Sequence, residues 1–189
     1  MPFDANPMAQ DAPMHALRTL LTTSLFAVFL ITLSAPSSAS AQAPNFSGDY
    51  TLDEGASDDF LAAFEPALEE MNPIKRALAR RYLKKSEGPD TRLRIEQNGE
   101  SVTLQGENRP AVTLPLSGER TSHQNDKGET VYLRARFRGA VLHVDMETDG
   151  GPFTTEYRMT PGGVLESRVR VVNEHLPMPV TYRLVYRAR

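Results

Sequence analysis

The chain of 189 residues has no cysteine and no tryptophan. Without cysteine it cannot form a disulfide framework, a thiolate metal site, a cysteine nucleophile or a lipid attachment through sulfur. It also lacks a large excess of either charge, because 21 lysines and arginines stand against 24 aspartates and glutamates, giving a formal net charge of -3. The basic excess that nucleic-acid binding requires for phosphate neutralisation is therefore missing. We expect no nucleic-acid partner.

Charge is also missing locally, since no charged side chain lies between Arg18 and Asp49. The stretch 19–33 reads TLLTTSLFAVFLITL, and small residues ending in Ala39-Ser40-Ala41 follow it. A positive flank, a short apolar core and an A-x-A site are typical of a secretory signal peptide. A membrane anchor is the alternative, but five hydroxylated residues dilute an apolar run that would need to be about 20 residues long.

We therefore predict that residues 1–41 are a signal peptide and that the protein is exported, to a periplasm or to the extracellular space. Residues 1–13 carry two aspartates and no base, which does not suit the start of such a signal. The sequence MHALR, which begins at Met14, does suit it. We predict Met14 as the initiator and 42–189 as a single domain.

Two helices are predicted near the start of this domain, after a first strand at 45–52. Ser57 is a suitable N-cap, and Phe60, Phe64, Leu68 and Met71 recur with helical spacing. Asn72-Pro73 ends this helix and begins a second, with asparagine as cap and proline at the first helical position. The second helix is predicted to run to about Lys84, with Ile74, Leu78 and Tyr82 on one face. The helical insert spans 57–85.

After Asp90 the apolar residues alternate with period two, which predicts strands joined by tight turns. The turn at Gly139-Ala140 places Phe137 opposite Leu142 and Arg134 opposite Asp145. The turn at Pro161-Gly162-Gly163 places Arg158 opposite Glu166 and Glu156 opposite Arg168.

This order of elements predicts a mainly β protein: an up-and-down antiparallel β-barrel of about 8 to 10 strands, with a helical hairpin inserted after strand one. Closing the sheet into a barrel would remove its unpaired edges. A β-sandwich is the competing architecture, because sequential hairpins alone do not force closure.

Several segments resemble the small secreted lipocalin-like, or calycin-type, proteins of bacteria. They are FSGDYTLD, LRIEQNGESVTL, FRGAVLHV, PGGVLESRV and TYRLVYRA. The helical hairpin resembles the two-helix lid that fatty-acid-binding proteins carry at the same place. The resemblance implies a barrel that binds lipids or other apolar molecules.

Two positions depart from those families. The tryptophan of the Gly-x-Trp opening motif is Tyr50 in this chain. The Arg-x-Tyr carboxylate clamp of the last strand is replaced by Arg183 and Tyr186, whose spacing of three places them on opposite faces of a strand. The carboxylate clamp is therefore not transferred to this chain.

The residue types that catalysis needs are scattered. His123, His143 and His175 lie at least 20 residues apart, and no nucleophile elbow, phosphate loop or dinucleotide fingerprint is present. His143 is predicted to be a solvated histidine on the outer face, beside Asp145 and Arg136. We expect no enzyme activity, no cofactor and no metal site.

The inner face of the barrel is the predicted ligand-binding surface, because hydroxylated and aromatic residues alternate there with aliphatic ones. A filled core is the alternative, since an eight-stranded barrel can either fill itself or hold one small ligand. The predicted ligand-binding residues are Phe64, Leu133, Phe137, Met146, Thr155, Tyr157, Ser167, Tyr182 and Tyr186.

The two predicted helices carry opposite charges, the first acidic and the second basic. They could pair with each other in an antiparallel hairpin. Alternatively, the basic helix could contact an anionic membrane surface or an acidic protein. The predicted contact residues are Lys75, Arg76, Arg80, Arg81, Lys84 and Lys85.

The sequence thus predicts an exported, monomeric, non-enzymatic protein that holds a small apolar or amphipathic ligand inside a β-barrel. The alternative is an envelope interaction module without a ligand, which would contact another protein through its outer faces and its charged helices.

Overall fold

The computed structural model describes residues 44–86, 88–107, 109–125 and 128–189. The predicted signal peptide 1–41 and its proposed initiator Met14 lie outside the described residues. Within the described part, no helix is long and apolar enough to cross a membrane.

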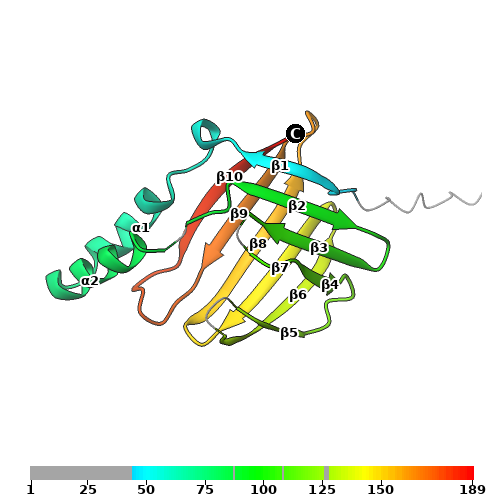
Figure 1. Cartoon of the computed structure of the whole chain (residues 1–189). Helices are drawn as coiled ribbons and strands as arrows, with labels where there is room; N and C mark the ends of the chain where they lie inside the picture. The colour runs from blue at the N-terminus through cyan, green and yellow to red at the C-terminus, as the bar shows by residue number, and fades with distance from the viewer. Residues whose placement is uncertain (1–43, 87, 108, 126–127) are drawn as a thin grey trace, which may run out of the picture. The chain divides into compact units, whose positions relative to one another are not determined.

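Ten antiparallel strands form one sheet that curves into a nearly closed barrel (Figure 1). They are β1 Gly48–Leu52, β2 Arg92–Gln97, β3 Ser101–Gly106, β4 Val112–Pro115, β5 Thr121–Gln124, β6 Thr130–Arg138, β7 Val141–Thr148, β8 Gly151–Met159, β9 Leu165–Val171 and β10 Val180–Ala188. The predicted mainly β barrel is confirmed. Strand β5 is the one element of the sheet that the hydrophobic pattern did not predict, since its alternation in TSHQ is polar on both faces.

The barrel closes where the first strand pairs with the last. Tyr50 lies opposite Ala188 and Leu52 opposite Tyr186, and the order of strands is β4-β3-β2-β1-β10-β9-β8-β7-β6-β5. The remaining opening lies between β4 and β5, which are not hydrogen-bonded to each other. A single bridge between Ser117 and Arg136 links the chain just after β4 to β6. This pairing makes the sheet a barrel with one gap.

The strand register agrees with the predicted pairs of both hairpins. Phe137 lies opposite Leu142 and Arg134 opposite Asp145, while Arg158 lies opposite Glu166 and Glu156 opposite Arg168. Gly139, with a φ of 58°, supplies the left-handed conformation that the two-residue turn between β6 and β7 requires. Register matters for function because it decides which side chains face the interior.

The helical hairpin consists of α1 Phe60–Glu69 and α2 Pro73–Leu83, with a short 3₁₀ helix at Glu54–Ala56 before it. Asn72 caps α2, as predicted, and accepts a hydrogen bond from the Lys75 amide at 2.9 Å. The predicted cap of the first helix is wrong: Asp59 caps α1 through the Ala62 amide. Ser57 instead accepts a hydrogen bond from the Val185 amide of β10, because the segment before α1 runs along that strand.

The first helix packs against β10 and the second helix packs against the first (Figure 1). Phe64, Ala67 and Leu68 of α1 are buried in this contact. The core that they join is built from the inward residues of the strands, of which Ile95, Val102, Leu114, Leu142 and Leu165 are almost fully buried. The hairpin is thus fixed to the barrel through α1.

Candidate functional site

The inner face of the barrel holds the predicted ligand-binding residues of the strands. Leu133 and Phe137 lie on β6, Met146 on β7, Thr155 and Tyr157 on β8, Ser167 on β9, and Tyr182 and Tyr186 on β10, all at inward register positions. Phe64 reaches the same core from α1. The structure brings all nine residues to one interior; their role in binding stays a prediction.

Aromatic side chains line the interior where α1 meets β10. The rings of Phe60 and Tyr182 are 5.5 Å apart and nearly perpendicular, and those of Phe64 and Tyr182 are 6.4 Å apart. Edge-to-face contacts of this kind stabilise an aromatic cluster beyond its buried area. Tyr182 is therefore held against α1, and its position depends on the hairpin.

A second aromatic contact involves the segment before β1. The Phe46 and Phe137 rings stack at 6.0 Å, and the Tyr50 hydroxyl donates a hydrogen bond to the Phe46 carbonyl at 2.8 Å. Tyr50 thus links the first strand to the segment that precedes it. Gly48 leaves room for its ring, since a Cβ there would lie 3.0 Å from the Tyr50 hydroxyl.

Hydroxyl groups gather on the inner face of three neighbouring strands. Tyr157 lies opposite Ser167, and Thr155 and Tyr182 both lie opposite Val169. Tyr186, four residues further along β10 than Tyr182, donates a hydrogen bond to the Asp90 carbonyl at 3.0 Å. The inner wall of β8, β9 and β10 therefore carries a polar strip within an otherwise apolar interior.

Burial raises the pKa of these tyrosines, because ionising a phenol inside protein forfeits the hydration of its charge. The pKa of Tyr182 rises to about 12. The pKa values of Tyr157 and Tyr186 are raised further, first by burial, and the Asp90 carboxylate raises both while the Arg109 guanidinium lowers them. The phenols are therefore neutral hydrogen-bonding groups at any physiological pH.

Sequence reasoning missed Asp90 and Arg109, which lie near these tyrosines. Arg109 Nε is 3.6 Å from an Asp90 carboxylate oxygen, and Arg109 also donates to the Gly88 carbonyl at 3.3 Å. The Asp90 carboxylate lies over the α-carbon of Gly106, where any Cβ would collide with it. Both charged residues are in connecting segments, where no periodicity marks a direction.

The six predicted contact residues of the second helix divide into two groups. Arg76 donates hydrogen bonds to the carbonyls of Leu68, Glu69 and Met71 at the end of α1, and Arg80 forms a bidentate pair with Glu65. The expected pairing of opposite charges between the helices thus occurs between Arg80 and Glu65, whereas Arg76 bonds the backbone. The others, Lys75, Arg81, Lys84 and Lys85, are exposed and form no ion pair with any described residue.

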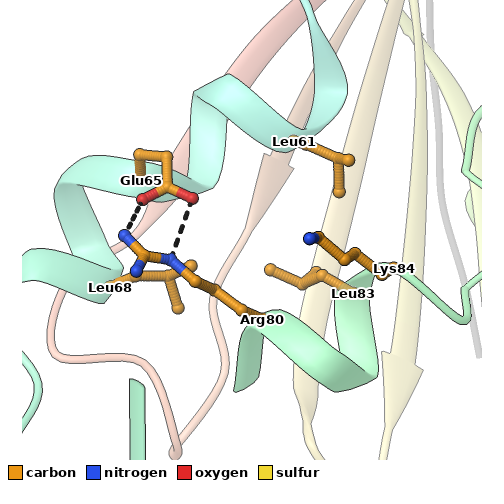
Figure 2. A pocket seen from close by; sticks show the side chains of 6 residues that line it. All are labelled: Leu61, Glu65, Leu68, Arg80, Leu83 and Lys84. Carbon is orange, nitrogen blue, oxygen red and sulfur yellow. Dashed lines mark hydrogen bonds and ion pairs between the residues drawn. The ribbon is translucent and has the colours of Figure 1, made fainter. Parts of the chain in front are cut away.

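A pocket of about 320 Å³ lies between the two helices (Figure 2). Figure 2 shows the Arg80 guanidinium turned toward the Glu65 carboxylate at one side and the Lys84 ammonium beside Leu61 at the other. The lining residues are Leu61, Glu65, Leu68, Arg80, Leu83 and Lys84. The hairpin therefore has an amphipathic crevice of its own, outside the barrel interior.

The apolar face predicted for the second helix points outward. Ile74 is 84% exposed, Leu78 68% and Tyr82 64%, whereas Ala79 and Leu83 pack toward the core. Three large apolar side chains at spacings of four form an exposed stripe along α2. A continuous apolar stripe on a protein surface usually marks a site that contacts another molecule or a membrane.

The structure corrects the expectation for His143. It lies on the outer face, as predicted, but it is only 8% exposed rather than solvated, and its Nδ1 lies 3.5 Å from a Glu156 carboxylate oxygen. The neighbouring Asp145 carboxylate accepts hydrogen bonds from Arg136 and Thr154. Among the described residues, no group of three or more histidine, aspartate and glutamate side chains could hold a metal ion.

Comparisons with known proteins show similarity in fold alone. No family model matches the chain, and no curated protein matches its sequence significantly. A secretary abundant heat soluble protein from Ramazzottius varieornatus has a similar structure, with 16% identity and a TM-score of 0.54 over 76% of this chain and 95% of that one.

Two further solved structures are similar. Apo lipid binding protein 8 from Caenorhabditis elegans has 11% identity and a TM-score of 0.51 over 79% of this chain and 100% of that one. A mutant of the REP1-NXSQ fatty acid transporter has 12% identity and a TM-score of 0.50 over 76% of this chain and 97% of that one. The barrel with a helical hairpin is thus the fold that proteins with lipid-binding names also have.

Proposed function

We propose that this protein is a non-enzymatic carrier that binds one small apolar or amphipathic molecule inside its barrel. The observation that supports this function most directly is the inner wall of β8, β9 and β10. It carries hydroxyls among apolar neighbours, from Thr155, Tyr157, Ser167 and Tyr182. A few placed polar groups within an apolar enclosure are typical of sites for small amphipathic ligands. The similarity in fold to lipid-binding and fatty-acid-transporting proteins supports the proposal.

The test is a titration of delipidated protein with a neutral, environment-sensitive fluorophore such as Nile red. We expect saturable binding with one site per chain. Thr155→Phe should weaken it at least tenfold, because the larger ring occupies interior space. Thr181→Phe is the matched control: Thr181 is the exposed neighbour of Tyr182 on β10, and its substitution should leave binding unchanged. Non-saturable binding, or equal loss in both variants, would contradict the proposal.

A second proposal concerns α2, which we infer contacts an anionic membrane surface to load or release the ligand. The exposed stripe of Ile74, Leu78 and Tyr82 would enter the interface. The cations Lys75, Arg81, Lys84 and Lys85 would lie near acidic headgroups, each contributing about 1 kcal/mol near such a surface. An apolar stripe beside basic residues is typical of helices that lie in a membrane interface.

Vesicle flotation tests this contact. Vesicles with acidic phospholipid should bind the protein, and neutral vesicles should bind it much less. The double variant Lys75→Glu with Arg81→Glu should abolish the difference, whereas Arg168→Glu with Arg170→Glu, on the exposed outer face of β9, should retain most of it. Capture of one stoichiometric protein in place of vesicles would favour the interaction module instead.

Export is part of the same proposal, since a periplasmic or extracellular carrier fits the predicted signal peptide. Mass spectrometry of the protein from its own host should find a mature chain that begins at Gln42. An intact N-terminus on the folded protein would contradict export by this signal.

A further inference from the structure

Most hydroxyls of the polar strip inside the barrel have no hydrogen-bond partner in the described part of the protein. Within the described residues, no hydrogen bond joins the hydroxyls of Thr155, Tyr157, Ser167 or Tyr182 to any other group. Two of these residues are deeply buried, Ser167 being 2% and Tyr182 9% exposed. Their hydroxyl oxygens are nevertheless not sealed from a water-sized molecule, since in the described part of the chain the buried side-chain polar atom that lacks a partner is Arg136 Nε. The four hydroxyls on adjacent strands can therefore form hydrogen bonds with a molecule that enters the barrel, whether water or a ligand.

No cation reaches this strip from the wall of the barrel. Every arginine in the ten described strands lies at an outward register position, and these strands contain no lysine. The inward titratable base is His123 on β5, opposite Val131. The outward arginines are Arg92, Arg94, Arg134, Arg136, Arg138, Arg158, Arg168, Arg170, Arg183 and Arg187.

The cation nearest the tyrosines, Arg109, is already matched by an anion. Its guanidinium lies 3.6 Å from the Asp90 carboxylate, and the Asp90 carbonyl holds the Tyr186 hydroxyl. A carboxylate entering this region would meet Asp90 without gaining an unpaired positive charge. Burying an anion without a countercharge is far more costly than burying a neutral polar group.

We propose that the polar group of the ligand is uncharged, a hydroxyl or an ester carbonyl, and that Tyr157, Ser167 and Tyr182 bind it. This inference rests on the proposed carrier function. A tyrosine hydroxyl can donate to a carbonyl oxygen and can accept from an alcohol, so both neutral headgroups fit the strip. The ligand class is therefore a neutral long-chain amphiphile rather than an ionised fatty acid.

The test compares three ligands with the same chain: hexadecanol, methyl hexadecanoate and hexadecanoate at pH 8, each displacing Nile red. We expect the alcohol or the ester to bind at least about tenfold more tightly than the ionised acid. Tyr157→Phe combined with Tyr182→Phe removes two hydroxyls while keeping both rings, and should weaken the neutral ligands about tenfold. Tyr132→Phe, on the outer face beneath Arg120, is the matched control and should change nothing.

A pH series adds a second measurement. Acidification neutralises hexadecanoate, so its affinity should rise toward that of the alcohol. The alcohol itself does not titrate, so any change of its affinity with pH comes from the protein. The charged and titratable groups near the strip and on the inner face are Asp90, Arg109, His123, Tyr157, Tyr182 and Tyr186.

The outcomes separate the two proposals. If ionised hexadecanoate binds as tightly as the alcohol, or if the double tyrosine variant keeps the wild-type affinities, the inference about the headgroup is wrong and the carrier function stands. If none of the three ligands displaces the fluorophore, the carrier function itself fails and the inference fails with it.

Discussion

At the scale of single residues, Tyr182 connects the helical hairpin to the interior of the barrel. Its ring packs against Phe60 and Phe64 of α1 while its hydroxyl belongs to the polar strip. A substitution at this position can therefore be designed to test either role: removal of the ring alters the hairpin contact, and removal of the hydroxyl alone leaves it in place.

The raised pKa of Tyr182 predicts a loss of stability in alkali. Its pKa rises from 10.0 to about 12 on folding, so the folded state holds the proton more tightly than the unfolded state. The resulting contribution to the free energy of unfolding, roughly 3 kcal/mol, is fully present below pH 10 and is lost as the pH rises through about 12. Tyr182→Phe should make the fall in unfolding free energy between pH 9 and 12 shallower, as measured by urea denaturation.

Tyr132→Phe serves as the control for this measurement, because it removes a hydroxyl from the outer face. Its free energy of unfolding should fall with pH as steeply as that of the wild type. Equal slopes for all three proteins would show that Tyr182 does not titrate with a raised pKa.

Residues on strands could be predicted from the sequence more readily than residues in loops. The period of two placed Thr155, Tyr157 and Ser167 inside, since a one-residue error would have turned every apolar neighbour to solvent. Asp90 and Arg109 have no such constraint, and the sequence offered no signal that they approach the tyrosines. The burial of His143 was likewise missed, because alternation gives the face of a strand but not how closely long neighbours cover it.

At the scale of elements, the helical hairpin is held together by Arg76. Its guanidinium donates to three carbonyls at the end of α1, at distances of 2.6 to 3.0 Å. The last carbonyls of a helix lack the full set of partners that its interior has. The Leu68 carbonyl also accepts from the Met71 amide at 3.0 Å, and the guanidinium adds a donor and a positive charge at the negative end of the helix dipole.

Arg76→Ala should therefore lower the free energy of unfolding by about 1 to 2 kcal/mol. Arg81→Ala removes an exposed arginine from the same helix and should change stability by less than about 0.5 kcal/mol. Chemical denaturation followed by circular dichroism measures both. Equal effects of the two substitutions would mean that the contacts of Arg76 do not stabilise the hairpin.

The hairpin also shows that helical periodicity predicts where a helix lies in the sequence but not which of its faces packs. Capping by Asn72 and Pro73 was predictable because it depends on local chemistry. The orientation of α2 was not predictable, because either of two faces could have packed against α1. One face carries Ile74, Leu78 and Tyr82, and the other carries Arg76, Ala79 and Leu83. The face with Ala79 and Leu83 packs against α1. From this face Arg76 bonds the carbonyls at the end of α1, and the short side chain of Ala79 allows the two helices to approach each other.

At the scale of the whole barrel, the two boundaries of the sheet should differ in stability. The seam between β1 and β10 is hydrogen-bonded, whereas β4 and β5 end the order of strands. Amide hydrogen exchange should be fast in β4 and β5 and slow in β10, because protection follows paired backbone and buried contacts. Uniform protection across all ten strands would contradict an opening between β4 and β5.

The seam between β1 and β10 also determines how long a loop folding must close. The bond from Arg187 to Asp53 joins residues 134 positions apart, and the Arg189 amide bonds the Asp49 carbonyl. The first strand, β1, gains its second neighbouring strand only when β10 has been made. Closing the barrel therefore closes a large loop, which slows folding, and a variant cut before β10 would leave an unsealed sheet rather than a slightly shorter protein.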